Sequence, residues 1–567
     1  MDLVVKSPTT EGRFGFMFKS EPSHLASIDA EAADKLLDRL GATMVEQPDV
    51  GGTSTLNNEN DTWNENPNPN LRSGFTFVGQ FVDHDITFDT TLLDEQESDP
   101  DATTNFRTPR YDLDAIYGRG PNLDPQFYKA ADRDKFDLIP TKYTTIKRFG
   151  TDITDTLKTE QTLYDVPRLA PDPDTGEAKA IIADPRNDQT LIILQLHVAF
   201  QMFHNKLVDT LRASGTPRSA VFEAARRLAR WHYQWIVTHE FIPAIVGQAM
   251  SDSVYKEVKD KAPVINLKYY NPTNPAGRAF IPVEFAVAAY RFGHSITRPR
   301  YTVQDYVTDQ VVIDPATGKP KVDPVTGQTV YATVPVSSVP LFEAKPTENN
   351  LNGHRALPPR LRIQWSKFFN VDNTKPTARP VRQFDASLAG PLQRLPGTAL
   401  PDTNPLGLLS QRNLRRGRKM GLPSGQQVAR LMGVTPLTNA QLGQNYRIKV
   451  NVPIPTTGPG ANVVVVDPGN EGLVPNDSLK TELAKPEWGG EAPLWFYILK
   501  EAEIVGKGRT LGPVGGRIVA EVLVGLLSKD PNSYLALNPG WKPGPPVTPV
   551  RGQFKMADLL NFAGVWS

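Results

Sequence analysis

The chain has 567 residues, 62 basic and 62 acidic side chains, and no cysteine. A net charge of zero gives no bulk attraction to nucleic acid or to an anionic membrane surface. The absence of cysteine excludes disulfides, thiolate nucleophiles and Cys-based metal sites. No Sec-type signal peptide is visible at the start, and no stretch approaches the roughly 18 apolar residues of a membrane span. We therefore expect a soluble protein, and the sequence leaves open whether it is cytoplasmic or secreted by a non-classical route.

In chain order, the sequence predicts a mainly α protein with small β-hairpin insertions. Apolar residues at helical spacing predict helices over residues 28–40, 74–88, 190–211, 219–246, 285–296 and 518–527. The pattern Asp-Pro-x-Thr-Gly predicts tight turns at residues 172–176, 314–318 and 323–327, and the last two lie between β-branched runs that are typical of hairpins. Residues 440–475 also have an extended pattern.

Length alone favours two to four domains, because a single hydrophobic core rarely organises so long a chain. The motifs described below nevertheless extend over most of the sequence. We therefore predict an N-terminal extension over residues 1–60 and one large domain over residues 61–567, with a hairpin insertion at about 300–345.

The helix predicted over residues 74–88 has an unusual combination of side chains. Its phenylalanines recur at helical spacing, which indicates a buried stripe. On a helix, Gln80, Asp83 and His84 fall within one arc of about 100°, whereas Asp85 turns away from that arc. Polar groups on a buried face are unfavourable unless partners satisfy them. The helix therefore carries either a hydrogen-bonded core network or a functional site.

The pattern Gln-x-x-Asp-His-Asp resembles the distal helix of the animal-type haem peroxidases, members of the peroxidase–cyclooxygenase superfamily. This resemblance implies a large helical peroxidase domain that binds haem b. It implies that His84 moves the proton of a bound peroxide, a task that suits the ordinary pKa of histidine. It also implies that Gln80 borders the place where halide or water binds, and that Asp83 could form an ester bond to the haem.

The segment after this helix has oxygen donors at every second residue, a pattern that suits Ca²⁺ because this ion takes six to eight hard oxygen ligands. An acidic surface loop is the alternative interpretation. In the family, calcium is bound by such a loop and by the Asp that follows the distal His. The resemblance therefore implies the calcium ligands Asp85, Thr108, the carbonyl of Arg110, Asp112 and Asp114.

The segment 183–189 resembles the family's distal arginine segment. Arg186 stays charged and would stabilise negative charge that develops on a peroxide oxygen; an ion pair at a helix N-terminus is the alternative. Gln189 stands where mammalian members have the Glu that forms an ester to haem, and Thr190 stands where one member has a sulfonium-forming Met. An amide cannot form that ester, so at most one ester bond, through Asp83, is implied.

Two further motifs resemble the proximal side of the family's haem site. In Tyr-Arg-Phe-Gly-His at residues 290–294, His294 resembles the iron ligand, and Arg291 lies on the same helical face, where it could pair with a haem propionate. Asn413 precedes a Gly-Leu-Pro at 421–423 and would accept the other ring N–H of His294. A solvated or phosphate-binding basic patch is the alternative for the segment around Asn413.

Together the motifs predict a haem peroxidase that reduces hydrogen peroxide and oxidises small donors, with iodide, bromide and thiocyanate as candidate donors. One alternative is a fatty-acid dioxygenase of the cyclooxygenase-like branch. Its radical Tyr lies three residues before the proximal His, where this chain has Arg291, and Tyr290 would point elsewhere on a regular helix. Another alternative is a non-catalytic haem-binding or calcium-binding adhesion module. The presence of His84 and Arg186 disfavours it, because haem binding requires neither.

Overall fold

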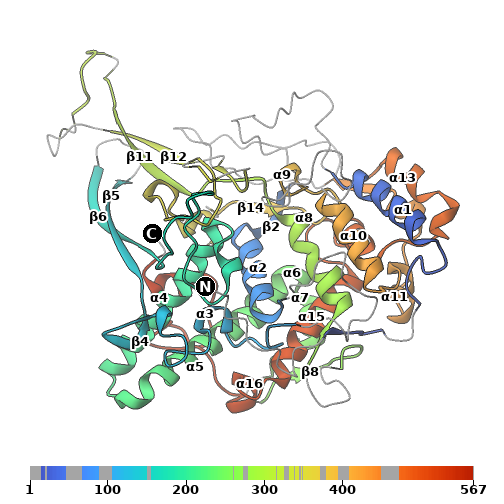
Figure 1. The fold of residues 1–567 in the computed structure, drawn as a ribbon, viewed down its shortest axis with the longest axis horizontal. Helices are drawn as coiled ribbons and strands as arrows, with labels where there is room; N and C mark the ends of the chain where they lie inside the picture. Colours follow the sequence, from blue (N-terminus) through green and yellow to red (C-terminus); the bar gives the residue numbers. More distant parts are fainter. Residues whose placement is uncertain are drawn as a thin grey trace.

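The computed structural model in Figure 1 describes most of the chain, and helices predominate in it. The described residues are 14–18, 22–45, 67–88, 105–149, 155–258, 261–271, 279–314, 316–322, 324, 331–336, 339–343, 346–347, 349–370, 378–393, 408–447 and 472–565. The structure is 46% helix and 14% strand, which confirms the mainly α class predicted from the sequence.

Four of the six helices predicted from apolar periodicity are present with boundaries shifted by a few residues, whereas a π-turn interrupts the one predicted over 219–246 and the one predicted over 285–296 is irregular. The α-helices are α1 Ala30–Thr43, α2 Gly74–Ile86, α3 Asp114–Tyr117, α4 Leu191–Ala213, α5 Arg218–Ile236, α6 Ile242–Val246, α7 Gln248–Val254, α8 Gly293–Ile296, α9 Gly390–Gln393, α10 Leu409–Lys419, α11 Gly425–Leu431, α12 Asn439–Leu442, α13 Asp477–Leu483, α14 Leu494–Ile504, α15 Pro513–Lys529, α16 Tyr534–Leu537 and α17 Met556–Ala563.

The strands form sheets of only two strands each within the described residues. The pairs are β1 Phe14–Gly15 with β9 Ile281–Pro282, β2 Pro67–Arg72 with β14 Pro380–Arg382, β3 Tyr128–Lys129 with β4 Asp132–Phe136, β5 Ile139–Phe149 with β6 Asp155–Asp165, β7 Tyr255–Lys256 with β8 Val264–Ile265, β10 Arg300–Tyr301 with β13 Val339–Pro340, β11 Gln304–Val311 with β12 Tyr331–Val336, and β15 Gln444–Arg447 with β16 Gly472–Pro475.

The predicted turns can be compared with these strands. In the turn at 172–176 the N–H of Gly176 donates to the carbonyl of Asp172 (2.8 Å), and in the turn at 314–318 the N–H of Gly318 donates to the carbonyl of Asp314 (2.8 Å). The second of these turns lies in the connection between β11 and β12. The turn predicted at 323–327 falls almost entirely outside the described residues, as do residues 448–471 of the stretch predicted as extended.

The distal helix α2 lies near the centre of the molecule, between α4 and α8 (Figure 1). The ring of Phe81 stacks on Phe200 of α4 with centroids 4.5 Å apart and meets Tyr233 of α5 edge-on at 5.7 Å. These contacts belong to a continuous hydrophobic core that includes residues from Phe14 to Ala563. The apolar stripe that the sequence predicted is therefore what holds α2 in place.

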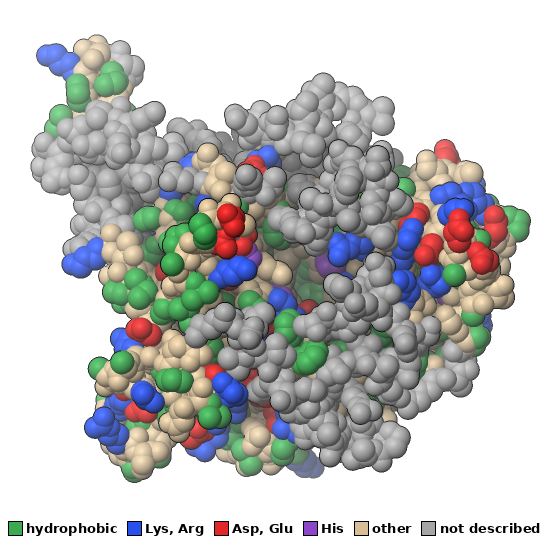
Figure 2. Space-filling view, in the orientation of Figure 1, with side chains coloured by type: hydrophobic (Ala, Val, Ile, Leu, Met, Phe, Trp, Pro, Cys, Tyr) green, Lys and Arg blue, Asp and Glu red, His purple; other side chains and the backbone are tan. Residues whose placement is uncertain are grey.

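Helix α1, which lies within the predicted N-terminal extension, packs against α10. Nε of Arg415 donates to Asp38 (2.8 Å), and Nη2 of Arg418 lies 2.8 Å from a carboxylate oxygen of Asp34. Figure 2 shows acidic and basic side chains gathered over this part of the surface. The domain boundary at residue 60 stays a prediction. Within the described residues, none of the helices combines the length and the apolar character that crossing a membrane requires.

Candidate active site

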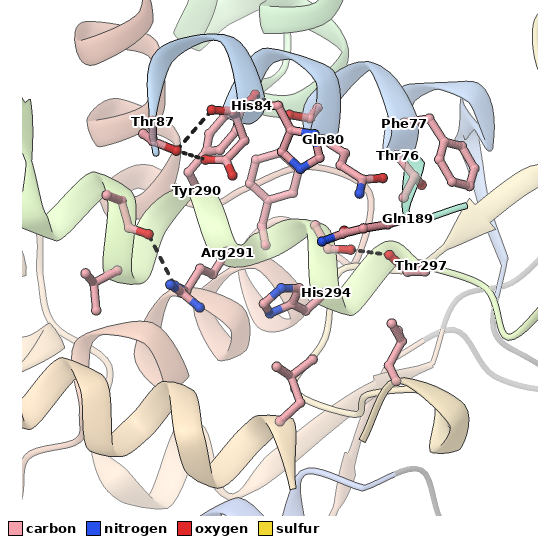
Figure 3. Close-up of a pocket in the computed structure, with 18 of the residues that line it drawn as sticks. Thr76, Phe77, Gln80, His84, Thr87, Gln189, Tyr290, Arg291, His294 and Thr297 are labelled. Carbon is pink, nitrogen blue, oxygen red and sulfur yellow. Dashed lines mark hydrogen bonds between the residues drawn. The ribbon is translucent and has the colours of Figure 1, made fainter. Parts of the chain in front are cut away.

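A cavity of about 310 Å³ lies between α2 and the segment 284–296. Figure 3 shows α2 along one side of this cavity and the segment that carries Arg291 and His294 along the other. Most of the residues predicted for the haem site line the cavity, namely Gln80, Asp83, His84, Gln189, Arg291 and His294. The sequence separation between these groups exceeds 200 residues, so the fold brings the distal and proximal motifs to one place.

The polar face of α2 is oriented as its helical spacing predicts. Gln80, Asp83 and His84 line the cavity, whereas Asp85 is fully buried on the other side of the helix. One oxygen of Asp83 accepts a hydrogen bond from the hydroxyl of Thr87 (3.0 Å), which is also drawn in Figure 3. The carboxylate of Asp83 is thus held at the cavity wall.

His84 is 5% exposed, and its ring is held from behind by Asn187. Nδ1 of His84 lies 2.8 Å from Oδ1 of Asn187. Because a carbonyl oxygen only accepts, Nδ1 carries the proton and Nε2 is free to act as a base. Burial and the nearby charge of Arg186 lower the pKa of His84 to about 4, so the ring is neutral at physiological pH. Sequence reasoning missed Asn187, although it follows Arg186 directly.

Arg186 is not among the described residues that line the cavity. Its guanidinium makes a bidentate pair with Asp184 (2.7 and 3.0 Å), and its Nη2 donates to the backbone carbonyls of His84 (2.9 Å) and Thr87 (2.7 Å). It also lies over the ring of Phe88, 4.5 Å from the centroid. Arg186 therefore contacts the C-terminal end of α2 and supports the backbone of His84 from behind.

The two positions that depart from the mammalian pattern lie side by side at the cavity. Gln189 is exposed and Thr190 is buried, and both line the cavity wall. The hydroxyl of Thr190 accepts a hydrogen bond from the N–H of Ile193 and so caps α4. Thr190 thus has a structural role as the N-cap of the helix that supports α2.

The proximal segment is not the regular helix that the sequence predicts. A π-turn over Glu284–Ala288 and a 3-10 turn over Ala289–Phe292 precede the short α8. These turns change the angular step between residues, so Tyr290 and Arg291 both line the cavity. The expectation that Tyr290 points elsewhere is therefore wrong. Its hydroxyl donates to the carbonyl of Gly79 on α2 (3.2 Å).

His294 and Asn413 are neighbours, as the motifs predict, but their hydrogen bond has the opposite sense. Nδ2 of Asn413 lies 3.0 Å from Nδ1 of His294, and Oδ1 of Asn413 accepts a hydrogen bond from Nη1 of Arg291. The expected bond, in which Asn413 accepts from His294, is absent because Arg291 occupies the acceptor. Burial and the charge of Arg291 lower the pKa of His294 to about 3.

Arg416 also lines the cavity and was not singled out from the sequence. It lies on α10, three residues after Asn413, and residues at this spacing share one face of a helix. The spacing could have identified it, but the segment has four other basic residues, and the sequence does not show which of them faces the site. The cavity thus has two described arginines on its wall, Arg291 and Arg416.

The loop predicted to bind calcium packs against the far side of α2. One oxygen of Asp85 accepts from the N–H of Leu113 (3.2 Å), and the other has no hydrogen-bond partner among the described residues. Thr108 donates to Asp112 (2.7 Å), whereas Asp114 lies 3.9 Å from Arg230. Burial and the charge of Asp112 raise the pKa of Asp85 well above its ordinary value.

These loop residues do not make a cluster of carboxylates. Among the residues that the structure describes, no group of three or more His, Cys, Asp or Glu side chains could hold a metal ion. Asp85 and Asp112 approach each other, while Asp114 is directed toward Arg230. A cation at this position would therefore depend on hydroxyl and carbonyl oxygens as well, and the predicted ligands Thr108 and Arg110 could supply them.

Comparison with known proteins finds a family model that matches the middle of the chain. Residues 93–323 match the family model described as animal haem peroxidase. This part of the chain is similar to an animal haem peroxidase domain. The matched segment contains the loop at 108–114, Arg186 and His294. His84 and Asn413 lie outside the matched segment.

Curated proteins that are similar to this chain match only in part. Chorion peroxidase of Drosophila melanogaster is 23% identical over 273 residues, which are 48% of this chain and 28% of that protein. Thyroid peroxidase of Sus scrofa is 27% identical over 139 residues, which are 24% of this chain and 14% of that protein. The aligned part thus spans less than a third of each of these relatives.

Solved structures with the same fold cover nearly the whole chain. Peroxidase A from Dictyostelium discoideum is 13% identical with a TM-score of 0.50, and the alignment covers 94% of this chain and 92% of that one. Fatty acid alpha-dioxygenase from Oryza sativa is 13% identical with a TM-score of 0.52, covering 99% of this chain and 83% of that one. At this level of identity the likeness concerns the fold alone, which agrees with the helical architecture described above.

Proposed function

We propose that this protein is a haem peroxidase that reduces hydrogen peroxide and oxidises small electron donors. The observation that carries the proposal is the pair His84 and His294, which line one cavity from two segments 210 residues apart. Each ring has an asparagine at its Nδ1, so each presents Nε2 as its remaining nitrogen. His294 can then bind iron, and His84 can accept and donate protons.

The described residues fit a haem. An added Cβ at Gly293 would meet nothing within 4 Å, so there is open space beside His294 for a flat ligand. Arg291 and Arg416 on the same wall are suited to bind the two carboxylates of a haem. When bound through His294, haem b supplies the redox chemistry of peroxide reduction. Among the described residues that line the cavity, Asp83 is the one carboxylate able to form an ester bond to it.

Iron binding requires a rearrangement of the proximal hydrogen bonds. A neutral His294 that binds iron through Nε2 carries its proton on Nδ1, which then needs an acceptor. Asn413 would become that acceptor if its side-chain amide rotated so that Oδ1 faced His294. Oδ1 would be free to do so once Arg291 paired with a haem carboxylate and no longer donated to Asn413. The short contact between Arg291 and Asn413 thus links carboxylate binding to the tautomer of His294.

On the distal side, His84 is the proton-transfer group. Neutral His84 takes a proton from one oxygen of hydrogen peroxide and delivers it to the other, and positioned acid–base transfer of this kind accelerates a reaction by about 10²–10⁴-fold. With its pKa lowered to about 4, His84 remains available as a base over the whole physiological range. Gln80, one turn earlier on α2, borders the same space and is placed to orient peroxide, water or a small anion.

Arg186 acts through His84. Its side chain holds the carbonyls of His84 and Thr87, so it sets the position of the ring, and its charge keeps that ring neutral. In the direct role, Arg186 would stabilise negative charge on the departing peroxide oxygen, and this would require its guanidinium to leave Asp184. We therefore propose the indirect role as the main contribution of Arg186.

Calcium binding on the far side of α2 is a second element of the proposal. The ligands are Asp85, Thr108, the carbonyl of Arg110, Asp112 and Asp114. The charge of Asp112 helps to raise the pKa of the buried Asp85, and a divalent cation would neutralise the negative charge of these two neighbouring carboxylates. Because Asp85 follows His84 directly, an ion held here would fix the helix at its catalytic position.

Fatty-acid oxygenation is a second candidate function, because Tyr290 lines the cavity and the rice dioxygenase shares the fold. The hydroxyl of Tyr290 is occupied by the carbonyl of Gly79, and Arg291 stands three residues before His294, so peroxidase activity is the better supported proposal. Oxygen consumption with palmitate in the absence of a reducing donor distinguishes the two: a dioxygenase consumes oxygen, and a peroxidase does not.

The proposed function is tested by loading the purified chain with haem. The holoprotein should contain close to one iron per chain and should oxidise guaiacol with hydrogen peroxide. His294→Ala should lose most of its haem, whereas His84→Gln should keep it and react about 10²–10⁴-fold more slowly with peroxide. His239→Gln, away from the cavity, is the matched control and should behave like wild type. A normal haem spectrum in His294→Ala would refute the assignment of the iron ligand.

A further inference from the structure

Three buried side chains from three separate segments form a hydrogen-bonded row behind the distal wall of the cavity. His84 lies on α2, Asn187 lies in the 3-10 turn Pro185–Asp188, and His197 lies on α4. Nδ1 of His84 is 2.8 Å from Oδ1 of Asn187, and Nδ2 of Asn187 is 3.1 Å from Nδ1 of His197. Asn187 and His197 are both fully buried. The amide of Asn187 thus has an imidazole ring at each end.

An amide between two neutral imidazoles allows two hydrogen-bonded arrangements. In the first, His84 donates from Nδ1 to the amide oxygen, and the amide nitrogen donates to Nδ1 of His197. In the second, the amide is turned around, His84 accepts at Nδ1, and its proton lies on Nε2. Only the first arrangement leaves a lone pair on Nε2 of His84. Burial lowers the pKa of both rings, to about 4 for His84 and about 3 for His197, so both are neutral.

The structure has the first arrangement, with the oxygen of Asn187 toward His84 and its nitrogen toward His197. Turning the amide around is compatible with hydrogen bonding only if both rings change tautomer at the same time. The second nitrogen of His197 has no hydrogen-bond partner among the described residues, so Asn187 is the group that decides the tautomer of His197 as well. The tautomers of His84 and His197 and the orientation of the Asn187 amide are therefore coupled to one another.

We propose that Asn187 and His197 are positioning residues that fix the tautomer of His84, so that Nε2 of His84 can accept a proton from a molecule bound in the cavity. The inference rests on the proposed function, since only peroxide reduction needs a proton acceptor at this place. Asn187 supplies the acceptor for the Nδ1 proton. His197 accepts the hydrogen bond from the amide nitrogen, so the amide can turn around only if His197 changes tautomer as well.

The tautomer can be observed directly, because protonated and unprotonated ring nitrogens of histidine differ strongly in ¹⁵N chemical shift. The full chain is labelled with ¹⁵N-histidine and loaded with diamagnetic zinc protoporphyrin, and the signals of His84 are assigned from their loss in His84→Gln. We expect His84 to be protonated on Nδ1 and unprotonated on Nε2 at neutral pH. This measurement requires neither turnover nor peroxide.

Variants of Asn187 separate tautomer control from simple packing. Asn187→Leu should abolish the Nδ1 preference of His84. In the iron holoprotein it should slow the association of HCN at least tenfold, because HCN gives up its proton to a base in the cavity when it binds iron. Asn187→Asp keeps an oxygen acceptor toward both rings and should keep the proton on Nδ1. The matched control is Asn205→Leu on α4, whose amide bonds Phe136 at both ends (2.8 and 3.1 Å) away from the cavity.

Asn205→Leu should be less stable than wild type. The ring signals of His84 should be unchanged in this control, and its rate of HCN association should be within twofold of wild type. A wild-type His84 protonated on Nε2 would overturn the proposal, and so would unchanged ring signals and HCN association in Asn187→Leu. If Asn187→Leu does not fold, two other measurements still test the proposal. They are the wild-type spectrum, and the spectrum of His197→Phe, in which His84 should be a mixture of the two tautomers. A correct tautomer in a holoprotein that does not react with peroxide would refute the proposed function and leave the positioning role intact.

Discussion

Asp184 is fully buried between two guanidinium groups, and its replacement by asparagine tests how the distal side is held together. One oxygen of Asp184 lies 2.5 Å from Nη2 of Arg107 and 2.7 Å from Nη2 of Arg186. Asp184 is 0% exposed and also accepts a hydrogen bond from the N–H of Arg186 (3.0 Å). Asp184→Asn keeps the shape of the side chain but leaves two cations close together with no counter-charge.

The size of the effect follows from burial. Breaking a buried ion pair by removing one partner is destabilising by about 3–5 kcal/mol. Burial disfavours the charged form of Asp184, but the charges of Arg186 and Arg107 outweigh it and hold its pKa well below the ordinary value. An acid with a lowered folded-state pKa contributes stability above its unfolded pKa of about 3.8 and loses it as the pH falls further. The difference between wild type and Asp184→Asn should therefore be constant from about pH 5 upward and shrink below about pH 4.

Urea unfolding at several pH values measures this difference. The matched control is Asp209→Asn, which breaks an ion pair of the same length (2.5 Å) between Lys135 and an Asp209 side chain that is 55% exposed. Exposed pairs of this kind contribute about 0–1 kcal/mol. Asp184→Asn should also lower the rate of peroxide reduction, because Arg186 loses the partner that orients it toward the carbonyl of His84. A loss below about 1 kcal/mol for Asp184→Asn would refute the reasoning.

Three further predictions concern other parts of the molecule. Removal of calcium by a chelator, or Asp112→Ala, should lower both the melting temperature and the peroxide reactivity, and exhaustive chelation with no effect on either would mean that the loop binds no ion. Burial raises the pKa of Glu501 to about 8, so its folded form resists ionisation and stability is lost as the pH rises from about 4.5 to 8. Glu501→Gln should thus be more stable than wild type at pH 8.5, by on the order of 5 kcal/mol, and equal to it near pH 4 in urea titrations. Wild-type protein should oxidise iodide and thiocyanate but not chloride, because covalent links tune the reduction potential of the haem and Gln189 cannot form one of them. Gln189→Glu should gain a second haem ester, which is measured as haem that no longer extracts into acid acetone.

The parts of the site that the sequence predicted are those that depend on local periodicity. On α2 the regular helical step was enough to place Gln80, Asp83 and His84 on one face and Asp85 on the other, and the cavity lies on the predicted face. The same reasoning failed for Tyr290, because a π-turn and a 3-10 turn alter the step just before His294. The residues themselves do not predict those turns, which pack against the distant helices α14 and α15.

Contacts between distant segments account for most of what the sequence did not predict. The bond between His84 and Asn187 joins residues 103 apart, and the contact of Arg291 with Asn413 joins residues 122 apart. The long hairpin β5–β6 is different, because its signal was present. Its strands are rich in threonine and other β-branched residues, which favour strands. The sequence therefore contained the information needed to predict this hairpin.

The position of the distal histidine is therefore decided by segments outside the helix that carries it. Arg186 holds the backbone carbonyl of His84, Asn187 holds its ring, and the N–H of Leu113 holds the adjacent Asp85. These three anchors belong to two different loops, and none of the three anchoring residues is among the described residues that line the cavity. A substitution behind the helix can thus alter the reactive ring without touching the cavity wall. For this reason the pattern of α2 was enough to find His84, whereas its tautomer and its pKa could only follow from the folded structure.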